Sequence, residues 1–370
     1  MSKKVTKEQI RAFAQSQGLD LVGFANIERF ENAPKRMHPA SIFPECKTVI
    51  AVTRRILRGN WRGIEEGTYW PTYTYYGYHG LLNSFFIPVG VYETACFIED
   101  HGFEAVPYYP GVPETQPPAE PLRPDGVPAQ VHLAIRIAGV AAGVGEMGWS
   151  KVFMTKKFGP RQRLAAILTD LEVEPDPLLE PNTLCDRCMA CVTGCQADAI
   201  PHVKDGKTVK IKIEDKEYEW GDVDMGRCTL GYHGGDTQVS PFLHKTFPGL
   251  SFDVRKQHVS EDMAYKMCWP RTFGTWRKTA EDPSGYLVEG HAQIAKWGGG
   301  AGAGSYGIGG SRGCMRSCFD RIERCDKCDQ TFKGGPFIKR DRWLLPCDVP
   351  PNPDLAGKAC GVPDDTNPTR

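Results

Sequence analysis

Four cysteines between residues 185 and 195 have the residue type and spacing of an iron–sulfur ligand set. Their intervals follow C-x2-C-x2-C-x3-C, and two residues between successive thiolates let a chain wrap around one corner of a [4Fe–4S] cube. Zinc is the alternative, but zinc sites usually pair two C-x2-C units across a longer loop. The spacing therefore predicts a cluster that involves Cys185, Cys188, Cys191 and Cys195.

A second cluster is expected, because the last cysteine of such a run usually ligates a different cluster from the first three. Cys314 and Cys318 follow the C-x3-C half of the same pattern, in which one thiol serves the second cluster and the other returns to the first. Ser311 stands where the pattern has a further cysteine, so Cys268 or a non-cysteine ligand would complete the set. Cys228 is a further candidate ligand, and a single cluster with spare buried thiols remains an alternative.

A third group of cysteines lies near the end of the sequence. One C-x2-C pair is followed by two distant thiols, which suits a structural zinc site or a third cluster. The C-x2-C pair would otherwise supply the missing ligand of the second cluster. The residues are Cys325, Cys328, Cys347 and Cys360.

The composition and the first residues indicate the cellular compartment and the partners to expect. The chain has 370 residues, with 45 Lys and Arg against 45 Asp and Glu, so no net field directs it to nucleic acid or an anionic membrane. The first residues lack the apolar segment of a signal peptide, and no long apolar run indicates a transmembrane helix. We therefore expect a cytoplasmic chain without nucleic-acid or membrane partners, whose 14 cysteines stay reduced or bind metal.

Residues 1–178 alternate helical and strand patterns, which predicts a layered domain of the α/β (α+β) class. Thr6 and Gln9 form a capping-box pattern at the start of the first helix. Further helices are expected at 81–101 and at about 129–142, and strands at 20–25, 48–53, 104–109 and 163–171.

Twelve of the 14 cysteines lie from residue 185 onward, where glycine is frequent and periodicity fades. Residues 179–330 therefore form a cysteine-rich module with a long insert, 229–313, and residues 331–370 form a cysteine-containing C-terminal extension. Within the module, residues 208–213 and 217–220 alternate like a β-hairpin. The glycine-rich stretch 298–313 is either a flexible loop or a place where the backbone lies close to a cofactor.

Several motifs together resemble the reductive dehalogenase and epoxyqueuosine reductase superfamily. They are the glycines at 143–148, the stretch Lys157-Phe-Gly-Pro-Arg-Gln-Arg163, the cysteine run, and Trp220-x-x-Asp-x-x-Arg-Cys228. The resemblance covers about residues 6–230 together with Cys314 and Cys318. It implies a nitroreductase-like domain that holds a base-off corrinoid, followed by a ferredoxin-like module with two clusters.

By the same resemblance, a low-potential donor such as a ferredoxin or flavodoxin reduces the clusters, which pass electrons to the corrinoid and on to a small organic substrate. Clusters reach potentials that are low enough for this supply. A homodimer is compatible with an enzyme of this size. The residues that the resemblance assigns to the corrinoid are Tyr76, Tyr78, Gly143, Gly145, Gly148, Lys157 and Arg161.

Reduction of the substrate also requires a proton donor. The superfamily uses a tyrosine or an aspartate, and Asp125, Tyr109 and Tyr108 stand at a comparable distance before the cysteine run. Each of them can equally be a loop-capping or packed side chain.

The sequence also departs from the superfamily at Gln196, which replaces the usual proline, and in the long insert. The alternative function is therefore a corrinoid-free, ferredoxin-like electron-transfer subunit of a larger redox complex.

Overall fold

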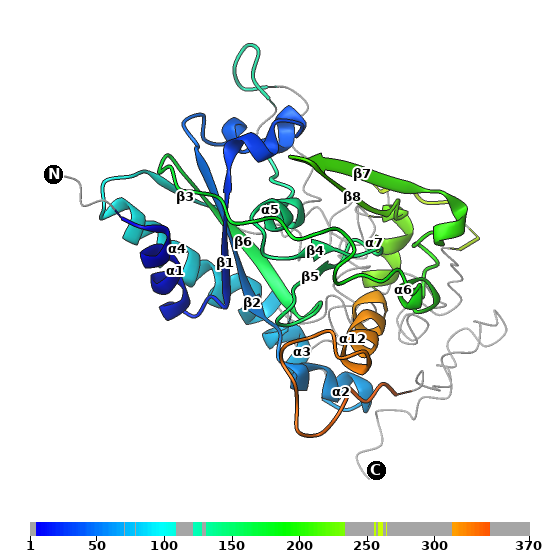
Figure 1. The fold of residues 1–370 in the computed structure, drawn as a ribbon. Coiled ribbons are helices and arrows are strands. Elements are labelled where there is room, and N and C mark those ends of the chain that lie inside the picture. Colours follow the sequence, from blue (N-terminus) through cyan, green and yellow to red (C-terminus); the bar gives the residue numbers. More distant parts are fainter. Residues whose placement is uncertain are drawn as a thin grey trace, which may run out of the picture.

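The computed structural model describes residues 5–69, 71–77, 79–108, 121–127, 131–233, 255–256, 258–261, 264 and 313–340. Within these ranges the chain mixes helices and strands, as the sequence predicts (Figure 1). Some residues that the sequence singled out lie outside the described ranges. They are Tyr78, Tyr109, Cys268, Ser311, Cys347 and Cys360.

A four-stranded sheet in the order β1-β2-β6-β3 forms the centre of the N-terminal domain. Every strand pairing in this sheet is antiparallel. Of the two fold classes that the sequence suggested, α/β and α+β, the sheet therefore matches α+β. Pro107 lies in β3, an edge strand of the sheet. Proline has no N–H to donate, and edge strands tolerate it because one of their sides has no neighbouring strand. The strands are β1 (Leu21–Asn26), β2 (Thr48–Arg55), β6 (Gln162–Thr169) and β3 (Ala105–Tyr108).

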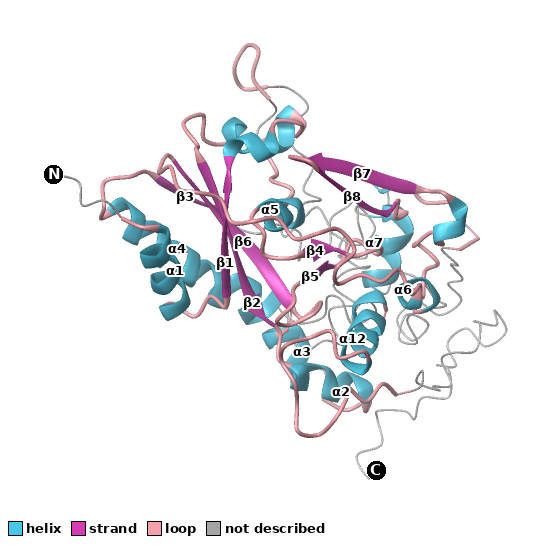
Figure 2. Cartoon of the chain, viewed as in Figure 1, coloured by secondary structure: helices cyan, strands magenta, loops and turns pink. Residues whose placement is uncertain are grey.

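Helices cover both faces of this sheet (Figure 2). In β2, Ile50 and Val52 point into one core with helices α1 (Lys7–Ser16) and α4 (Ile87–Glu99). Val49 and Ala51 point into a second core with α5 (Ile135–Ala141). Successive side chains of a strand face opposite ways, so a strand that is buried on both faces reads as a continuous apolar run.

Shorter elements connect the strands and helices of this domain. The helix expected from about residue 129 begins only at Ile135. The connecting elements are η1 (Ile27–Phe30), η2 (Lys35–Met37), η3 (Pro39–Ser41), η4 (Arg58–Trp61), α2 (Arg62–Glu65), α3 (Pro71–Tyr76), η5 (His79–Phe86), β4 (Glu146–Met147) and β5 (Phe153–Met154). The module contains α6 (Ala190–Thr193), η6 (Val203–Asp205), the hairpin β7 (Thr208–Ile213) and β8 (Lys216–Gly221), α7 (Met225–His233) and α12 (Cys314–Arg324).

Within the described part of the chain, one helical stretch, Leu81–Glu99, is long and apolar enough to cross a membrane by length and composition. Its residues Ile87, Val91 and Ile98 are buried in the core beside the sheet. A core helix of a globular protein meets the same criterion, so the finding is weak evidence for a membrane span.

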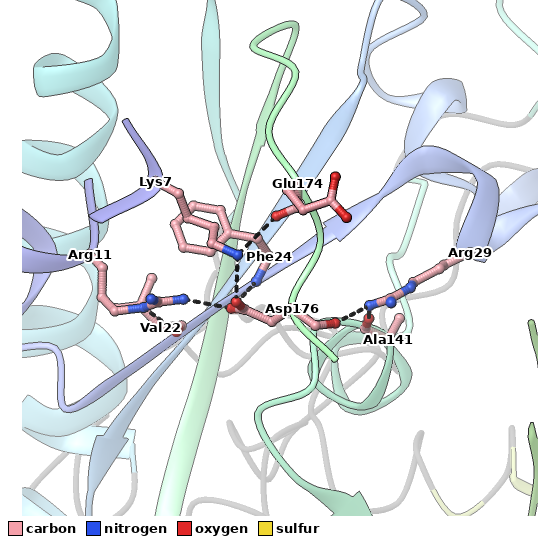
Figure 3. A network of polar contacts seen from close by, with 8 residues as sticks. All are labelled: Lys7, Arg11, Val22, Phe24, Arg29, Ala141, Glu174 and Asp176. Carbon is pink, nitrogen blue, oxygen red and sulfur yellow. Dashed lines mark hydrogen bonds and ion pairs between the residues drawn. The ribbon is translucent and has the colours of Figure 1, made fainter. Parts of the chain in front are cut away.

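The segment that leads from the sheet to the cysteine run is fixed by Asp176 (Figure 3). Its carboxylate pairs with Lys7 at 2.8 Å and with Arg11 at 2.7 Å, and it accepts a hydrogen bond from the Phe24 N–H at 3.2 Å. Arg29 donates to the Asp176 carbonyl at 2.7 Å and to the Ala141 carbonyl at 2.6 Å. The first helix, the first strand and the end of α5 thus converge on this segment.

Replacing Arg29 by methionine is expected to lower the free energy of unfolding by about 2–4 kcal/mol, because two buried carbonyls and Glu214 lose a charged partner. The Arg29 side chain is only 5% exposed. Urea unfolding measures the effect. Lys210→Met is the matched control, since its ion pair with Glu217 is exposed on both sides, and it should leave the midpoint unchanged. Equal midpoints for the two variants would contradict the structural role of Arg29.

Candidate iron–sulfur centre

The backbone between Cys185 and Cys191 turns tightly around its thiols. Arg187 and Met189, each between two successive cysteines, have φ values of 52° and 59°. Residues other than glycine seldom adopt this left-handed conformation, and they keep it only where the surrounding structure demands it. Helix α6 begins directly afterwards and includes Cys191. The local fold therefore wraps the chain in the way that cluster binding requires.

Helix α12 brings two further cysteines to this loop, and in Figure 1 it lies beside α6. The two helices meet at Gly194, because a Cβ atom at this position would collide with the Ser317 hydroxyl. Ser317 lies between Cys314 and Cys318 on α12. The absence of a side chain at residue 194 thus permits the approach that places both cysteines next to the run.

Four thiols form the first set, which we call thiol group one. Cys318 is partly buried, and burial of its thiol raises its pKa well above the usual range. The negative charges of Cys185, Cys191, Cys314 and Cys188 raise this pKa further, with Cys185 the largest of the four. Cys185 and Cys318 pack against the same small apolar core, and Cys185 also packs against a second core that contains Cys191. Thiol group one is Cys185, Cys188, Cys191 and Cys318.

Three further thiols form thiol group two. Burial is the main cause that raises the pKa of Cys228 to about 12, and the charges of Cys314 and Cys195 add to it. Burial likewise raises the pKa of Cys314 to about 12, with Cys195 as the next cause and Cys191 after it. Cys191 belongs to group one, so the two groups are adjacent. Thiol group two is Cys195, Cys228 and Cys314, and its predicted fourth ligand, Cys268, lies outside the described residues.

The donor chemistry of both groups fits iron–sulfur clusters. Backbone N–H groups already point at two of the sulfurs: Trp149 donates to Cys185 Sγ at 3.4 Å and Ala199 donates to Cys195 Sγ at 3.3 Å. Such bonds stabilise thiolates and tune the potential of a cluster. Buried neutral thiols would release their protons when they bind the metal.

Among the described residues, no three His, Cys, Asp or Glu side chains gather closely enough to hold a single metal ion. A mononuclear zinc site needs its sulfurs within about 2.3 Å of one ion. A cube of four irons instead holds its thiolates at its outer corners.

Cys325 and Cys328 lie at the end of α12. Cys328 is buried beside Ile322, and its thiol donates to the Lys157 carbonyl at 3.0 Å. Cys325 follows the last residue of the helix and interacts electrostatically with Arg321. These contacts describe a buried structural thiol at Cys328.

The glycines assigned to a corrinoid make room for protein atoms. A Cβ atom at Gly143, whose φ is +68°, would collide with the Pro177 carbonyl oxygen. One at Gly145 would collide with the Met154 carbonyl oxygen, and one at Gly148 would lie 2.8 Å from the Met154 side chain. These three glycines thus serve the close packing of the loop before the cysteine run.

The other assigned side chains also contact protein. Arg161 is 1% exposed and donates to the Ile56 carbonyl at 2.8 Å and to Gln330 at 2.6 Å. The Lys157 ammonium lies 5.4 Å from the centre of the Phe158 ring. Tyr76 ends α3 and is half exposed. The three glycines and Arg161 thus contact protein atoms, whereas Lys157 and Tyr76 are exposed.

The two described proton-donor candidates have different surroundings. Asp125 is exposed and has a φ of 60°. Tyr108 is partly buried at the end of β3. Burial raises the pKa of Tyr108 above its usual range, and a hydrogen bond to the Leu133 backbone opposes the shift. Tyr108 is therefore the more enclosed of the two and keeps its proton at neutral pH.

Sequence reasoning missed Glu146, a carboxylate that is buried beside the first cysteine. It accepts hydrogen bonds from the Cys185 N–H at 2.5 Å and from the Thr183 N–H at 3.0 Å. Burial raises its pKa, and these backbone bonds oppose the shift. An acidic residue within an apolar, glycine-rich loop was the signal in the sequence.

We expect Glu146→Ala to lower the affinity of the protein for iron by about tenfold. Replacing a residue that hydrogen-bonds to a metal ligand typically changes metal affinity by that amount. The Cys185 N–H would lose its acceptor, and the start of the cysteine loop would lose its fixed position. The measurement is the concentration of an iron chelator that removes half of the metal. Glu172→Ala, at an exposed position, is the control. The role assigned to Glu146 is contradicted by equal chelator resistance in both variants.

No protein-family model matches the chain. Among curated proteins, the tetrachloroethene reductive dehalogenases of Dehalobacter restrictus and Desulfitobacterium hafniense are each 38% identical to it over 95 residues. The matched segment is 24% of this chain and 17% of those relatives, so most of their length has no counterpart in the match. The resemblance to reductive dehalogenases is confirmed over this segment.

Two solved structures have distant similarity to the chain. A reductive dehalogenase described for B12-dependent dehalogenation is 16% identical, with a TM-score of 0.43 over 95% of this chain and 42% of that one. Epoxyqueuosine reductase from Streptococcus thermophilus is also 16% identical, with a TM-score of 0.39 over 53% of this chain and 54% of that one. Nothing about the function of this chain follows from likenesses at this level.

Proposed function

We propose that the chain is an iron–sulfur oxidoreductase, a divergent relative of the reductive dehalogenases, that uses two clusters to deliver low-potential electrons to an organic substrate. The observation that carries the proposal is the packing of the cysteine run, Cys228 and the cysteines of α12 into two adjacent groups of thiols. The cysteine run and α12 are more than a hundred residues apart in sequence. The partial match to tetrachloroethene reductive dehalogenases supports the class of reaction.

Electrons enter at thiol group one. Cys188 is exposed, whereas Cys191 of the same group is buried and leads towards thiol group two. A low-potential donor of the ferredoxin or flavodoxin type would therefore reach the cluster of group one at the Cys188 corner. The chain's own part in this step is to hold the two clusters close together and to shield their inner sulfurs from water.

A corrinoid would supply the reactive metal for the reduction of the substrate. The family resemblance supports this cofactor, but the described residues that were assigned to it contact protein atoms. The same observation supports a second candidate function, a corrinoid-free electron-transfer subunit that passes electrons to another protein.

Metal analysis of protein purified without oxygen, from cells supplied with corrinoid, tests both candidates. About eight iron atoms per chain are expected if both groups hold a [4Fe–4S] cluster. One cobalt atom in addition would support the reductase, and iron without cobalt would support the electron-transfer subunit. Zinc in place of iron would overturn the proposed function.

A further inference from the structure

Helix α12 presents its cysteines on one face and a set of buried anchors on the opposite face. Cys314 and Cys318 are four residues apart, about one helical turn, so they share one side of the helix. Arg316, Phe319 and Glu323 follow each other at the i, i+3 and i+7 positions of a second stripe. The helix therefore faces the thiol groups on one side and the N-terminal domain on the other.

The first anchor is a buried ion pair between Arg316 and Glu65, the last residue of α2. Arg316 Nε donates to one oxygen of the Glu65 carboxylate, and Arg316 Nη2 donates to the other at 2.7 Å. The side chains are 7% and 0% exposed. The Glu65 carboxylate also accepts from the Arg340 N–H at 2.8 Å, and Arg316 donates to the Arg340 carbonyl. A bidentate pair of this kind fixes orientation as well as distance.

The second anchor joins the other end of α12 to η4. Glu323 pairs with Arg58 at 3.1 Å, and the two side chains are 7% and 10% exposed. Arg58 also donates to the Gly335 carbonyl at 2.6 Å, and its guanidinium lies 4.4 Å from the centre of the Phe332 ring. Arg58 is thereby held in place by the segment that follows the helix.

Between the two ion pairs, Phe319 packs into the core of the N-terminal domain. Its ring centre is 5.7 Å from that of Trp61 and 5.0 Å from that of Phe337. Aromatic packing excludes water from the ion pairs on either side, which strengthens them. Apolar contact by itself is non-directional and tolerates small rotations of a helix, whereas two charged pairs about two turns apart do not.

We propose that Glu65 and Arg58 are positioning residues of the iron–sulfur centre, an inference that rests on the proposed function. Glu65 acts through Arg316, and Arg58 acts through Glu323. They fix the rotation and axial position of α12, so that Cys318 meets thiol group one while Cys314 meets thiol group two. The cluster geometry would thus be set by the N-terminal domain, from residues about 250 positions earlier in the chain.

The test is the apolar double variant Glu65→Leu with Arg316→Met. Replacing both members of a buried ion pair by apolar residues often preserves stability, so the variant separates positioning from folding. We expect a thermal midpoint close to that of the wild type, chelator resistance of the cluster iron about tenfold lower, and a changed EPR spectrum of the reduced clusters. Wild-type chelator resistance together with an unchanged EPR spectrum would overturn the proposal.

A milder variant covers the case in which the double variant does not fold. Arg58→Lys keeps the charge but removes the planar guanidinium, whose Nη2 contacts both Glu323 and the Gly335 carbonyl and which lies over the Phe332 ring. The same two shifts in smaller size are expected. The matched control is Arg324→Ala, on the same helix, which removes an exposed pair with Asp320 and should leave both readouts at wild-type values. Identical behaviour of Arg58→Lys and the control would count against the proposal.

If the wild-type protein binds no iron, the proposed function is refuted. Amide hydrogen exchange then tests separately whether the ion pair between Glu65 and Arg316 holds α12 in place. In iron-free protein, the amides of α12 should exchange slowly in the wild type and at least about tenfold faster in Glu65→Gln. Equal exchange rates in these two proteins would show that the ion pair does not hold the helix.

Discussion

A Cys188→Ala variant is expected to lose the iron of thiol group one, about four atoms per chain, while the rest of the protein stays folded. Cys188 is exposed, so the substitution leaves no cavity in a core. The group would keep three thiols, and the binding of a metal centre depends on its full ligand set. Iron analysis together with the visible absorption of the clusters measures the loss.

Cys96→Ala provides the matched control for this prediction. Cys96 is a partly buried thiol of α4, which packs beside the sheet. It should leave the iron content unchanged. A Cys188→Ala protein with wild-type iron would contradict the assignment of thiol group one and with it the proposed function.

Cys318→Ala and Cys314→Ala are expected to remove different clusters, although the two residues lie one turn apart on the same helix. Cys318 belongs to thiol group one and Cys314 to thiol group two. Each variant should therefore retain about half of the iron, from one remaining [4Fe–4S] cluster. EPR spectra of the reduced proteins should differ, because the surviving clusters have different surroundings.

Comparison with a variant of the cysteine run makes this second prediction decisive. The spectrum that remains in Cys318→Ala should match the one in Cys188→Ala, since both lose group one. The spectrum in Cys314→Ala should match the one in Cys228→Ala, since both lose group two. Identical spectra for Cys318→Ala and Cys314→Ala would show that the two thiols serve one cluster.

Local patterns in the sequence were sufficient for the elements of the N-terminal domain. The strands expected at 48–53 and 163–171 match β2 and β6 to within two residues. The capping box of Thr6 and Gln9 is also present as predicted. These features depend on neighbours within a few residues, and the sequence displays such neighbours directly. Helix ends were predicted less accurately, because α5 begins at Ile135 and not near residue 129.

The assignments that relied on remote contacts behave differently. The family resemblance assigned Gly143, Gly145 and Gly148 to a corrinoid, and in the structure atoms of Pro177 and Met154 lie where their Cβ atoms would be. Glu146 went unnoticed because its partners at Thr183 and Cys185 are nearly forty residues away. A pattern shows that a position needs a small or an acidic residue, but it does not show which atoms cause the need.

By itself, the sequence determined that Cys185, Cys188 and Cys191 act together, because a spacing of two residues brings thiols to one turn of the backbone whatever the remaining fold is. The C-x3-C pattern also predicted that Cys314 and Cys318 divide between two clusters. Only the tertiary structure shows that α12 packs beside the cysteine run, with Cys318 near Cys185 and Cys314 in one core with Cys195 and Cys228. That division depends on where α12 lies. Its place is set by contacts with Glu65 and Arg58, which are distant in sequence and become neighbours only when the buried faces of the two segments pack together.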